Sequence, residues 1–493
     1  MLNQPVKIVG IKSPLARVLV LGMFGVLVWR AVSLADPIDI GARRELFVDK
    51  YLIDRLDGAA LKLHSPQPAN VALQLDRPWE GPYCGYFTVM KVGPVYRMYY
   101  RGLPVLQDAT EQETTCYAES DDGITWSRPD LSLFEVHGTR ENNVILHGHA
   151  PVSHNFSPFL DVKPGVSPRE RFKAIGGSSE SGLIPFVSAD GVRWRKLREQ
   201  PIITKGAFDS QNVVFWSELE RCYVCYFRTS KGEVRWISRC TSPDFLNWTR
   251  PVEMEFGDTA VEHLYTNQTQ PYFRAPHIYI AFPMRFFPDR GVLREEQVQK
   301  LNVHPSYLRY ARTQCSDGVF LTSRGGSRYD RTFREAFVRP GLDPGNWVSR
   351  TMMAALGVVP TGPAEMSLYY HQHDGQYTFH LRRYTLRTDG FVSVNAPSTG
   401  GELLTKPITF VGRELSVNFS SSAAGGLRVE IQDAGGQPIP GHTMADAREK
   451  IGDDLDARVS WNKGSDVSAL AGRPIRLRFL LQDADLYSLQ FRP

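Results

Sequence analysis

The sequence lacks the patterns of several common classes of protein. It has no glycine-rich loop of the kind that cradles phosphate, no basic stripe with interleaved aromatic residues, and almost no helical periodicity. Beyond residue 35, no apolar stretch approaches the length needed to span a bilayer. These absences argue against a nucleotide site, a nucleic-acid partner, a largely helical fold and a membrane-spanning body.

The positions of the six cysteines argue against a metal site and against disulfides. Cys222 and Cys225 are three residues apart, so on a strand they would point to opposite faces and could not share a metal ion. His371 and His373 share a strand face but have no third ligand nearby. We therefore expect no metal and no cofactor. Most cysteines lie in apolar runs, so buried free thiols are favoured over disulfides.

The N-terminus is the one place with an excess of charge. Residues 1–35 contain four basic residues and no acidic one, and a 12-residue apolar run extends from Val18 to Trp29. Small residues at Ser33 and Ala35 follow, which is the pattern of a secretory signal cleaved after Ala35. The alternative is an uncleaved membrane anchor. We predict a signal peptide at 1–35 and a periplasmic or secreted protein.

The rest of the chain is electrically neutral. Of 57 basic and 53 acidic residues in all, the signal takes four basic ones and leaves equal numbers. A neutral mature protein has no general attraction to nucleic acid or to an anionic membrane. Aromatic residues make up 11% of the sequence, which suits a β protein that binds carbohydrate.

A short motif recurs along the neutral part. Its copies begin at Ser120, Ser188, Ser242, Ser316 and Thr388, separated by 68, 54, 74 and 72 residues, and the last two copies are weaker. The clearest copy reads Ser-Asp-Asp-Gly-Ile-Thr-Trp, in which Asp accepts backbone N–H groups of a tight turn and Gly supplies a positive φ. Alternating strands precede each copy. Four short strands per repeat predict the blades of a β-propeller.

We therefore predict an all-β fold, with a five-bladed β-propeller over residues 36–398 and a β-sandwich over 399–493. The sandwich is expected from alternating strands separated by Gly and Asp turns after Gly400. In a propeller, the motif turns lie opposite the functional face, so Asp122, Asp190 and Asp244 should be structural. A single helix is expected within 291–301.

The motif resembles the aspartate box of sialidases and the Ser-x-Asp-Leu-x-x-Trp turns of five-bladed propeller glycosidases of the invertase-like and arabinanase-like families. Nearly all of the chain after the signal resembles exported bacterial proteins of the glycosyl hydrolase family 32-like group, through residues 47–53, 205–212 and 265–268. The resemblance implies a glycosidase. The signature runs of true invertases, such as Asn-Asp-Pro-Asn-Gly, are absent, so their catalytic residues do not transfer.

Candidate site residues lie just before the expected inner strands. Hydrolysis of a glycosidic bond needs one acid and one carboxylate that activates water or attacks directly. Asp209 is predicted as base or nucleophile, Glu262 as general acid and Glu80 as an orienting carboxylate. The predicted substrate-binding residues are Trp79, Arg101, His154, Asn155, Gln211, Asn212, Arg228, Asn267, Gln268, Arg285, Trp347 and Arg350.

The leading hypothesis is an exported glycoside hydrolase acting on a poly- or oligosaccharide with paired carboxylates at the propeller axis. Three expected second strands end in arginine, which would suit an anionic substrate because guanidinium groups pair with oxyanions. Two alternatives stay open. One is a non-catalytic carbohydrate-binding propeller, and the other is a sialidase-like or phosphorolytic enzyme acting on an anionic glycan.

Overall fold

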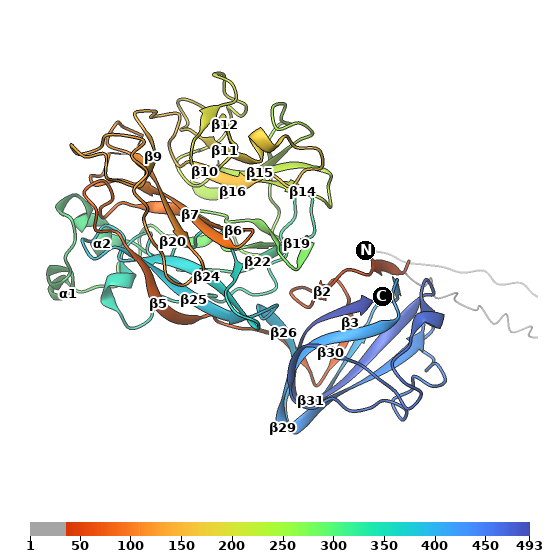
Figure 1. Cartoon of the computed structure of the whole chain (residues 1–493). Helices are drawn as coiled ribbons and strands as arrows, with labels where there is room; N and C mark the ends of the chain where they lie inside the picture. Colours follow the sequence, from red (N-terminus) through yellow and green to blue (C-terminus); the bar gives the residue numbers. More distant parts are fainter. Residues whose placement is uncertain (1–35, 108) are drawn as a thin grey trace, which may run out of the picture. The chain divides into compact units, whose positions relative to one another are not determined.

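The computed structural model describes residues 36–107 and 109–493, so the predicted signal peptide lies outside the described residues. Residues Pro37–Pro493 form one compact unit. The prediction of an all-β chain is confirmed, because strands dominate and the helices are short (Figure 1). The expected helix is α1 (Glu295–Lys300), and a second one, α2 (Leu308–Thr313), was not predicted. Four 3-10 turns complete the helical part: η1 (Pro168–Glu170), η2 (Pro305–Tyr307), η3 (Pro344–Trp347) and η4 (Ser468–Leu470).

Three antiparallel sheets of four strands follow one another, each with its strands in chain order. The first contains β6 (Gly85–Val92), β7 (Val95–Gly102), β8 (Thr114–Ser120) and β9 (Val144–His147). The second contains β10 (Ser157–Leu160), β11 (Phe172–Gly176), β12 (Ile184–Ser188) and β13 (Arg195–Lys196). The third contains β14 (Val213–Ser217), β15 (Cys222–Lys231), β16 (Val234–Ser242) and β17 (Val252–Glu253). β10 lies beside both β6 and β14.

The next region is less regular. It contains a sheet of β18 (Gln270–Tyr272), β19 (Ala275–Ala281) and β22 (Leu321–Ser323), with a ribbon of β20 (Met284–Phe287) and β21 (Cys315–Gly318) inserted between them. The last small sheet contains β23 (Val359–Pro360), β24 (Glu365–Gln372), β25 (His380–Arg387) and β5 (Gln67–Gln74). Its outer strand β5 comes from the N-terminal side of all the others, so the two ends of this series of sheets are joined by strand pairing.

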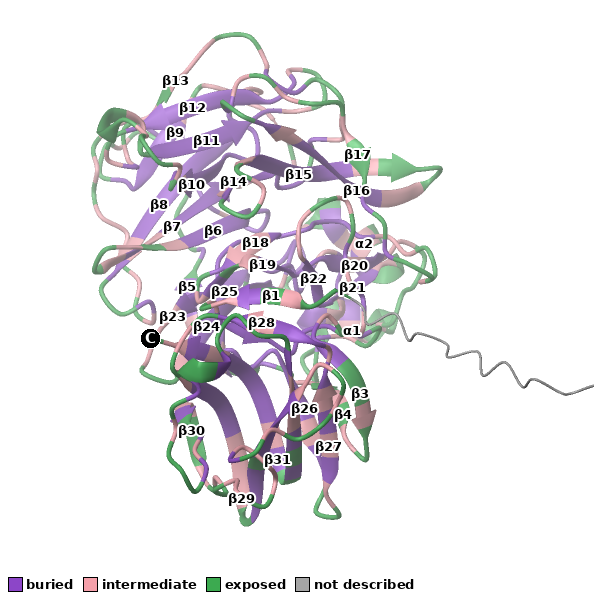
Figure 2. Ribbon diagram, turned by 90° about the vertical axis from the view of Figure 1, so that its right-hand side faces the viewer, coloured by how far each residue is buried: buried purple, intermediate pink, exposed green. Residues whose placement is uncertain are grey.

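Several strands of the small sheets are buried on both faces. β8 and β24 each have no exposed residue, because neighbouring sheets pack on both of their sides (Figure 2). Aromatic side chains fill the space between sheets, as in the stacked pair Phe87 and Tyr100, whose ring centroids are 5.3 Å apart. Each such fully buried side chain contributes about 1.5–3 kcal/mol relative to an exposed one.

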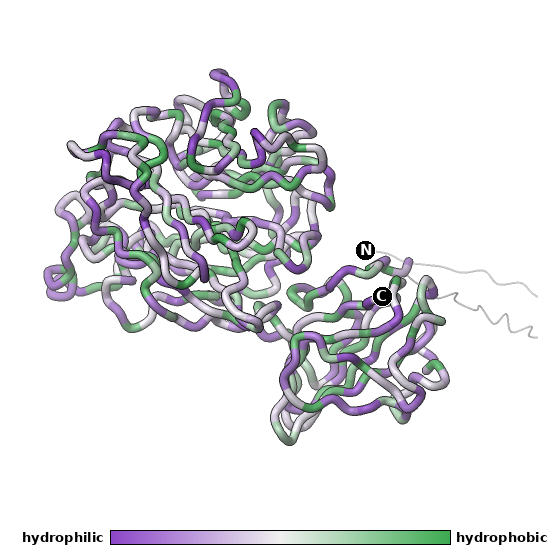
Figure 3. Tube along the Cα trace, in the orientation of Figure 1, coloured by the Kyte–Doolittle hydropathy of each residue, from purple (hydrophilic) through white to green (hydrophobic). Residues whose placement is uncertain are grey.

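The C-terminal strands instead alternate. In β27 (Gly401–Thr405) every second residue is buried, and β31 (Ile475–Arg492) begins in the same way. Hydrophobic and hydrophilic residues accordingly change along these strands over short distances (Figure 3). One face packs on a core that includes Phe47, Leu403 and Phe479, and the other meets solvent.

This C-terminal sheet has ten strands, four of which come from the N-terminal end of the described chain. The N-terminal members are β1 (Ile38–Gly41), β2 (Glu45–Leu46), β3 (Ile53–Asp57) and β4 (Ala60–Leu63). The others are β26 (Val392–Ala396), β27, β28 (Ile408–Phe410), β29 (Glu414–Asp433), β30 (Asp453–Arg458) and β31. The predicted division at residues 398 and 399 did not anticipate that residues 38–63 pair with the C-terminal strands.

The structural role predicted for the motif aspartates is confirmed for the three clear copies. Asp122 Oδ1 accepts N–H groups from Ile124 and Thr125 at 2.7 and 2.8 Å and the hydroxyl of Ser120 at 2.8 Å. Asp190 and Asp244 bind their turns in the same way.

The two weaker copies of the motif differ from this pattern. Asp317 lies on strand β21, and Arg285 donates to it from Nε at 2.9 Å and from Nη2 at 2.6 Å. Asp389 lies in a turn with φ of +64° but is fully buried.

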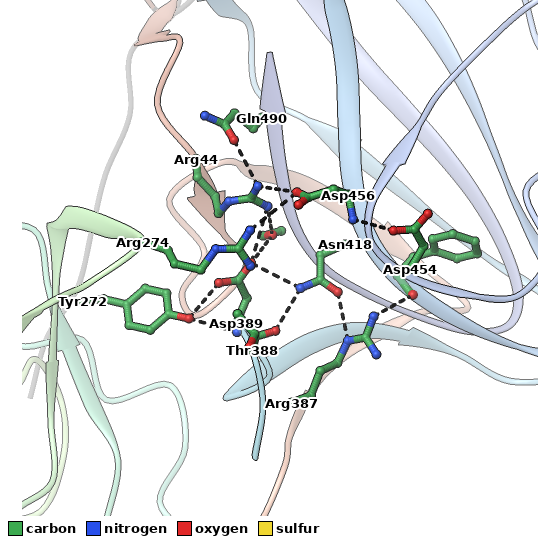
Figure 4. Close-up of polar contacts among 12 residues, drawn as sticks. Arg44, Tyr272, Arg274, Arg387, Thr388, Asp389, Asn418, Asp454, Asp456 and Gln490 are labelled. Carbon is green, nitrogen blue, oxygen red and sulfur yellow. Dashed lines mark hydrogen bonds and ion pairs between the residues drawn. The ribbon is translucent and has the colours of Figure 1, made fainter. Parts of the chain in front are cut away.

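Asp389 connects three parts of the chain (Figure 4). Its carboxylate accepts the Tyr272 hydroxyl at 2.7 Å, Arg274 at 3.0 Å and Ser488 of β31 at 2.8 Å. Arg44 approaches the same carboxylate at 3.4 Å and pairs with Asp456 at 2.6 Å. The fifth motif copy therefore anchors the small sheets to the N-terminal segment and to the C-terminal sheet.

Candidate functional site

Side chains from the inner segments of four sheets meet through two amides. Gln211 Nε2 donates to Thr88 Oγ1 of β6 at 2.8 Å and lies 3.5 Å from Ser157 Oγ of β10. Gln268 Nε2 in turn donates to Gln211 Oε1 at 2.5 Å. Both glutamines are fully buried. They thus hold the inner segments in register with one another, although they were predicted to bind substrate.

The same inner segments carry strained backbone. Tyr86, Asn155, Gln268 and Arg350 have φ between +45° and +60°, and none of them is glycine. Each such residue costs on the order of 1–3 kcal/mol and persists only where its surroundings impose the conformation. Strain of this kind gathers at sites that orient side chains for binding or chemistry.

A cluster of arginine and tyrosine side chains includes two of these strained residues, Tyr86 and Arg350. We call it the Tyr265 cluster, and it comprises Tyr86, Arg101, Asp209, Arg228, Arg235, Tyr265 and Arg350. Arg101 lies over the Tyr86 ring, 4.8 Å from its centroid, and donates to Asn155 Oδ1 at 2.9 Å. The Tyr86 hydroxyl donates to the backbone oxygen of Asp209 at 3.2 Å. The predicted residues Arg101, Asn155 and Asp209 are therefore brought together.

Asp209 is the open carboxylate of this cluster. Its side chain is 52% exposed, whereas its ion-pair partner Arg228 is 8% exposed. Arg228 therefore presents a fixed charge from within the protein, and Asp209 reaches solvent beside it. A second nitrogen of Arg228, Nη1, is buried and has no hydrogen-bond partner within the described part of the chain.

Tyr265 lies between two guanidinium groups. Arg228 and Arg235 lie over its ring at 4.7 and 5.2 Å from the centroid. Although burial opposes ionisation, Arg350 and Arg228 lower the pKa of the Tyr265 hydroxyl below its usual range. A phenol with a lowered pKa gives up its proton more readily near neutral pH.

Arg235 has the fewest partners in the cluster. Its guanidinium lies over the rings of Tyr265 and Phe286, and no residue in 36–107 or 109–493 forms an ion pair with it or accepts a hydrogen bond from its side chain. Burial, together with the like charges of Arg228 and Arg350, lowers the pKa of Arg235. This group is available to an oxyanion.

Arg350 is held more firmly. Its Nε donates to the Tyr307 hydroxyl at 2.8 Å and lies 3.3 Å from Asp374 Oδ2. The Tyr307 hydroxyl also donates to Asp374. A cavity of about 250 Å³ opens beside these groups. It is lined by Leu106, Arg235, Tyr265, Phe286, Tyr307, Tyr310, Gln314, Ser349 and Arg350.

His154 is connected to the Tyr265 cluster through Asn155. Its Nδ1 lies 2.7 Å from Glu113 Oε2, and its Nε2 lies 2.9 Å from the Asn155 side-chain nitrogen. Both His154 and Glu113 are buried. The pair orients Asn155, which in turn holds Arg101, so His154 acts through other residues.

The two other predicted catalytic carboxylates make different contacts. Glu80 has no exposed side-chain surface, and it accepts the Tyr100 hydroxyl at 2.6 Å and Arg128 at 2.7 Å. Its contacts assign it to the packing of the first sheet. Glu262 pairs with Arg285, at 3.4 Å, and with Arg331. All of these partners lie outside the Tyr265 cluster.

Most of the remaining predicted binding residues form hydrogen bonds with other residues of the chain. Trp79 is buried and donates to Asn143 Oδ1 at 2.9 Å. Asn212 donates to the Phe208 carbonyl at 3.3 Å, and Asn267 accepts the Thr269 N–H at 3.0 Å. Trp347 and Arg285 line a second cavity, described below.

Sequence reasoning missed Arg235, Tyr265 and Tyr307. Tyr265 is the first residue of the run 265–268, from which the prediction selected only the two amides, Asn267 and Gln268. Tyr265 itself, which precedes β18, was not considered as a site residue. Arg235 is the second residue of β16, a third strand, whereas the arginines considered were those at the ends of second strands and Arg350. Tyr307 belongs to the irregular insertion between β20 and β21, for which the repeat offered no guide.

Within the described ranges, no group of three or more His, Cys, Asp or Glu side chains is placed to hold a metal ion. No described helix combines the length and apolar character needed to cross a membrane.

Comparison with known proteins gives distant structural likeness only. No protein-family model and no curated protein matches the sequence. A solved structure described as a glycoside hydrolase is 14% identical, covers 66% of this chain and 92% of its own, and has a TM-score of 0.43. An N-acetylgalactosamine deacetylase from F. plautii is 13% identical, with coverage of 66% and 95% and a TM-score of 0.42.

A third similar structure is the catalytic domain of a Coprinopsis cinerea α-L-arabinofuranosidase. It is 11% identical, covers 66% of this chain and 98% of its own, and has a TM-score of 0.39. All three TM-scores lie below 0.5, so the likeness does not assign an activity to this chain.

Proposed function

We propose that the small sheets are the blades of a five-bladed β-propeller and that the ten-stranded sheet forms a β-sandwich. Five groups of strands follow in chain order, and β10 lies beside β6 and β14. The segment around Leu356 pairs with Thr88 of β6, and β5 completes the last sheet, as closure of a ring requires. The Tyr265 cluster would then lie at one end of the axis.

We further propose that the protein hydrolyses a glycosidic bond in an anionic saccharide at the Tyr265 cluster. The observation that carries this proposal is the excess of guanidinium groups around an open cavity. Arg235 and Arg350 line it, Arg228 lies behind Tyr265, and no carboxylate belongs to its lining. Arg235 has no carboxylate partner among the described residues, so it suits a carboxylate or sulfate on the sugar, with Arg228 and Arg350 adding positive charge nearby.

The chemistry would use Asp209 and Tyr265. Asp209 would take a proton from water as that water attacks the anomeric carbon, or would attack that carbon itself. The Tyr265 hydroxyl would donate its proton to the departing glycosidic oxygen. Where Asp209 takes the proton of the attacking water, solvent removes that proton and reprotonates Tyr265. Where Asp209 forms a glycosyl ester, a second water hydrolyses the ester and gives its proton to the Tyr265 phenolate, which frees Asp209. The lowered pKa of Tyr265 supports this role. Glu262, the acid expected from the sequence, is paired with two arginines elsewhere, so Tyr265 replaces it in the proposal.

The test is a hydrolysis assay on matched acidic and neutral substrates, for example aryl uronides, aryl hexosides and acidic and neutral polysaccharides. We expect cleavage of acidic substrates, with Asp209→Asn and Tyr265→Phe each about 10²–10⁴-fold slower. Asp244→Asn, in an exposed turn, is the matched control. Unchanged cleavage in both variants would remove these two residues from the mechanism. Cleavage of neutral substrates alone would remove the anionic substrate.

A non-catalytic carbohydrate-binding propeller is the second candidate. It is favoured by one observation, namely that no carboxylate, Asp209 included, lines the cavity. Binding of an acidic saccharide without any release of product, across the same panel, would support this candidate over hydrolysis.

Export through a signal peptide cleaved after Ala35 remains part of the proposal. The protein expressed with its complete N-terminus should be recovered from the periplasm or medium with Asp36 as its first residue, as measured by N-terminal sequencing. Recovery with residues 1–35 intact would favour a membrane anchor.

A further inference from the structure

The β20–β21 ribbon separates two cavities. Phe286 and Gln314 line the small cavity of the Tyr265 cluster, whereas Arg285, Phe287 and Cys315 line a larger one of about 730 Å³. Successive residues of a strand point to opposite faces, so the two cavities open on opposite faces of the same ribbon. The larger cavity, here called the Trp347 cavity, is lined by Arg285, Phe287, Arg290, Asp317, Arg339 and Trp347, among others. Its volume is within the range of small-molecule sites.

Two of its arginines have no anionic partner. Arg290 lies over the Phe287 ring, 5.3 Å from the centroid, and Arg339 is exposed. Neither forms an ion pair or a side-chain hydrogen bond with any residue that the structure describes.

The carboxylates of the lining are already engaged by the chain. Asp317 is bound by both nitrogens of Arg285, and Glu335 accepts the Arg334 N–H at 3.1 Å. Since Glu335 forms no ion pair among the described residues, the lining keeps two unpaired positive charges, Arg290 and Arg339, against one unpaired negative charge.

Trp347 supplies a flat apolar surface beside these charges. Its Nε1 donates to the Gly341 carbonyl at 2.9 Å, which fixes the orientation of the indole, and the residue is partly exposed. Aromatic faces of this kind pack against the apolar C–H surface of sugar rings. A held indole next to two unpaired guanidinium groups matches a ligand that combines a sugar ring with an oxyanion.

We propose that the Trp347 cavity is a second saccharide-binding site, specific for a sugar unit that carries a carboxylate or a sulfate. This site does not depend on the proposed function, because the Tyr265 cluster contributes no residue to it. Arg290 and Arg339 pair with the oxyanion, and Trp347 packs on the ring.

The experiment is isothermal titration calorimetry of the whole described chain, residues 36–493, with three oligosaccharides of equal length. One carries carboxylates (tetragalacturonate), one carries sulfates (a sulfated galactan tetrasaccharide) and one is neutral (a galactan tetrasaccharide). Two variants address the cavity, the double variant Arg290→Gln with Arg339→Gln and the single variant Trp347→Ala. The control is Arg250→Gln with Arg448→Gln, which removes the same charge from two exposed positions that make no side-chain contact among the described residues.

We expect an acidic tetrasaccharide to bind the unaltered protein at least tenfold more tightly than the neutral one. The double variant should lose one binding site or weaken it at least tenfold, and Trp347→Ala should weaken acidic and neutral ligands alike. Arg235→Gln, in the Tyr265 cluster, should leave this site intact.

Three results would overturn the proposal. They are equal binding by the double variant and its control, tighter binding of the neutral ligand, and no binding of either acidic ligand to the unaltered protein. The carboxylate and sulfate arms identify which oxyanion is bound. Loss of binding in Arg235→Gln alone would instead place the only site in the Tyr265 cluster, so failure of this site and failure of the proposed function are distinguishable.

Discussion

The surroundings of Asp389 and the Tyr265 cluster use the same residue types, but their arginines differ in how far carboxylates pair with them. Around Asp389, the guanidinium groups of Arg44 and Arg274 both reach Asp389 and Asp456, and the Tyr272 hydroxyl donates to the same carboxylate (Figure 4). In the Tyr265 cluster, Arg235 has no carboxylate partner among the described residues.

The difference separates charges that hold the fold from charges that are available to a ligand. A buried charge is costly unless it is paired and hydrogen-bonded, so a network saturated from within the chain indicates a structural role. Guanidinium groups that face a cavity without a partner keep their capacity to bind an anion. The number of arginines alone does not distinguish the two regions. The presence or absence of a carboxylate partner for each arginine does.

The largest effect should follow from breaking the saturated network. Asp389→Ala removes the buried carboxylate shared by Arg44 and Arg274 and leaves both guanidinium groups with Asp456 as their remaining counter-charge. We expect a loss of about 3–5 kcal/mol in the free energy of unfolding, measured by urea denaturation.

Asp122→Ala is the control for this change, because Asp122 belongs to the same motif but binds only its own exposed turn. Equal losses in the two variants would mean that the buried network contributes no more than a turn does, and would remove the distinction drawn above.

The second prediction concerns the unsaturated cluster. Arg235→Gln removes a guanidinium that has no ion-pair or hydrogen-bond partner within residues 36–107 and 109–493, so the free energy of unfolding should fall by no more than about 2 kcal/mol, through its two ring contacts. Binding of an acidic saccharide at this site should weaken roughly tenfold or more, since a hydrogen bond to a charged group contributes about 1.5–3 kcal/mol.

Calorimetry with the acidic and the neutral ligand measures this binding, and a urea titration measures the stability. A large loss of stability with unchanged binding would show that Arg235 is structural after all.

How far the sequence predicts these regions depends on what fixes each residue. The turn aspartates were predictable because their partners lie two and three residues away, within the motif itself. Asp209 and Arg101 were found because both flank strands that the repeat locates. Asp389 has a motif much like the others, but its partners are up to 345 residues away. No residue near Asp389 in the sequence indicates that it joins distant parts of the chain.

The inserted segment between β20 and β21 could not be predicted for a related reason. It interrupts the repeat and carries Tyr307, so periodicity gives no position for it. Glu80 shows the opposite error. Its place before an inner strand suggested a functional carboxylate, but Arg128, 48 residues later, turns it into a buried ion pair.

The third prediction concerns the electrostatic effect of the arginines on Tyr265. Since Arg350 and Arg228 lower the pKa of Tyr265 against the effect of burial, removing one positive charge should raise it. Arg350→Gln should therefore move the ionisation of Tyr265 to higher pH, measured as the phenolate absorbance difference between each protein and its Tyr265→Phe counterpart.

If Tyr265 is the proton donor, activity falls as pH rises through its pKa, and this alkaline limb should move upward with the absorbance change. An ionisation that does not move, or moves to lower pH, would contradict the electrostatic account.

The smallest effect is expected in the turns. Burial raises the pKa of Asp244, but hydrogen bonds outweigh it and lower the pKa to about 2. They come from the N–H and side chain of Asn247, the Leu246 N–H and the Ser242 hydroxyl. Its folded-state pKa is thus below the unfolded value of about 3.9. The stabilisation is complete above the unfolded pKa and is lost as pH falls through the folded one.

Because Asp244 is exposed, solvent screening keeps the contribution to about 1 kcal/mol or less. Asp244→Asn should accordingly destabilise the protein slightly at pH 7 and much less near pH 2, where Asp244 is about half protonated in the folded state, as followed by urea denaturation at both pH values. A destabilisation that persists undiminished at pH 2 would mean that the turn depends on the shape of the side chain rather than on its charge. The contrast with Asp389 would then rest on packing alone.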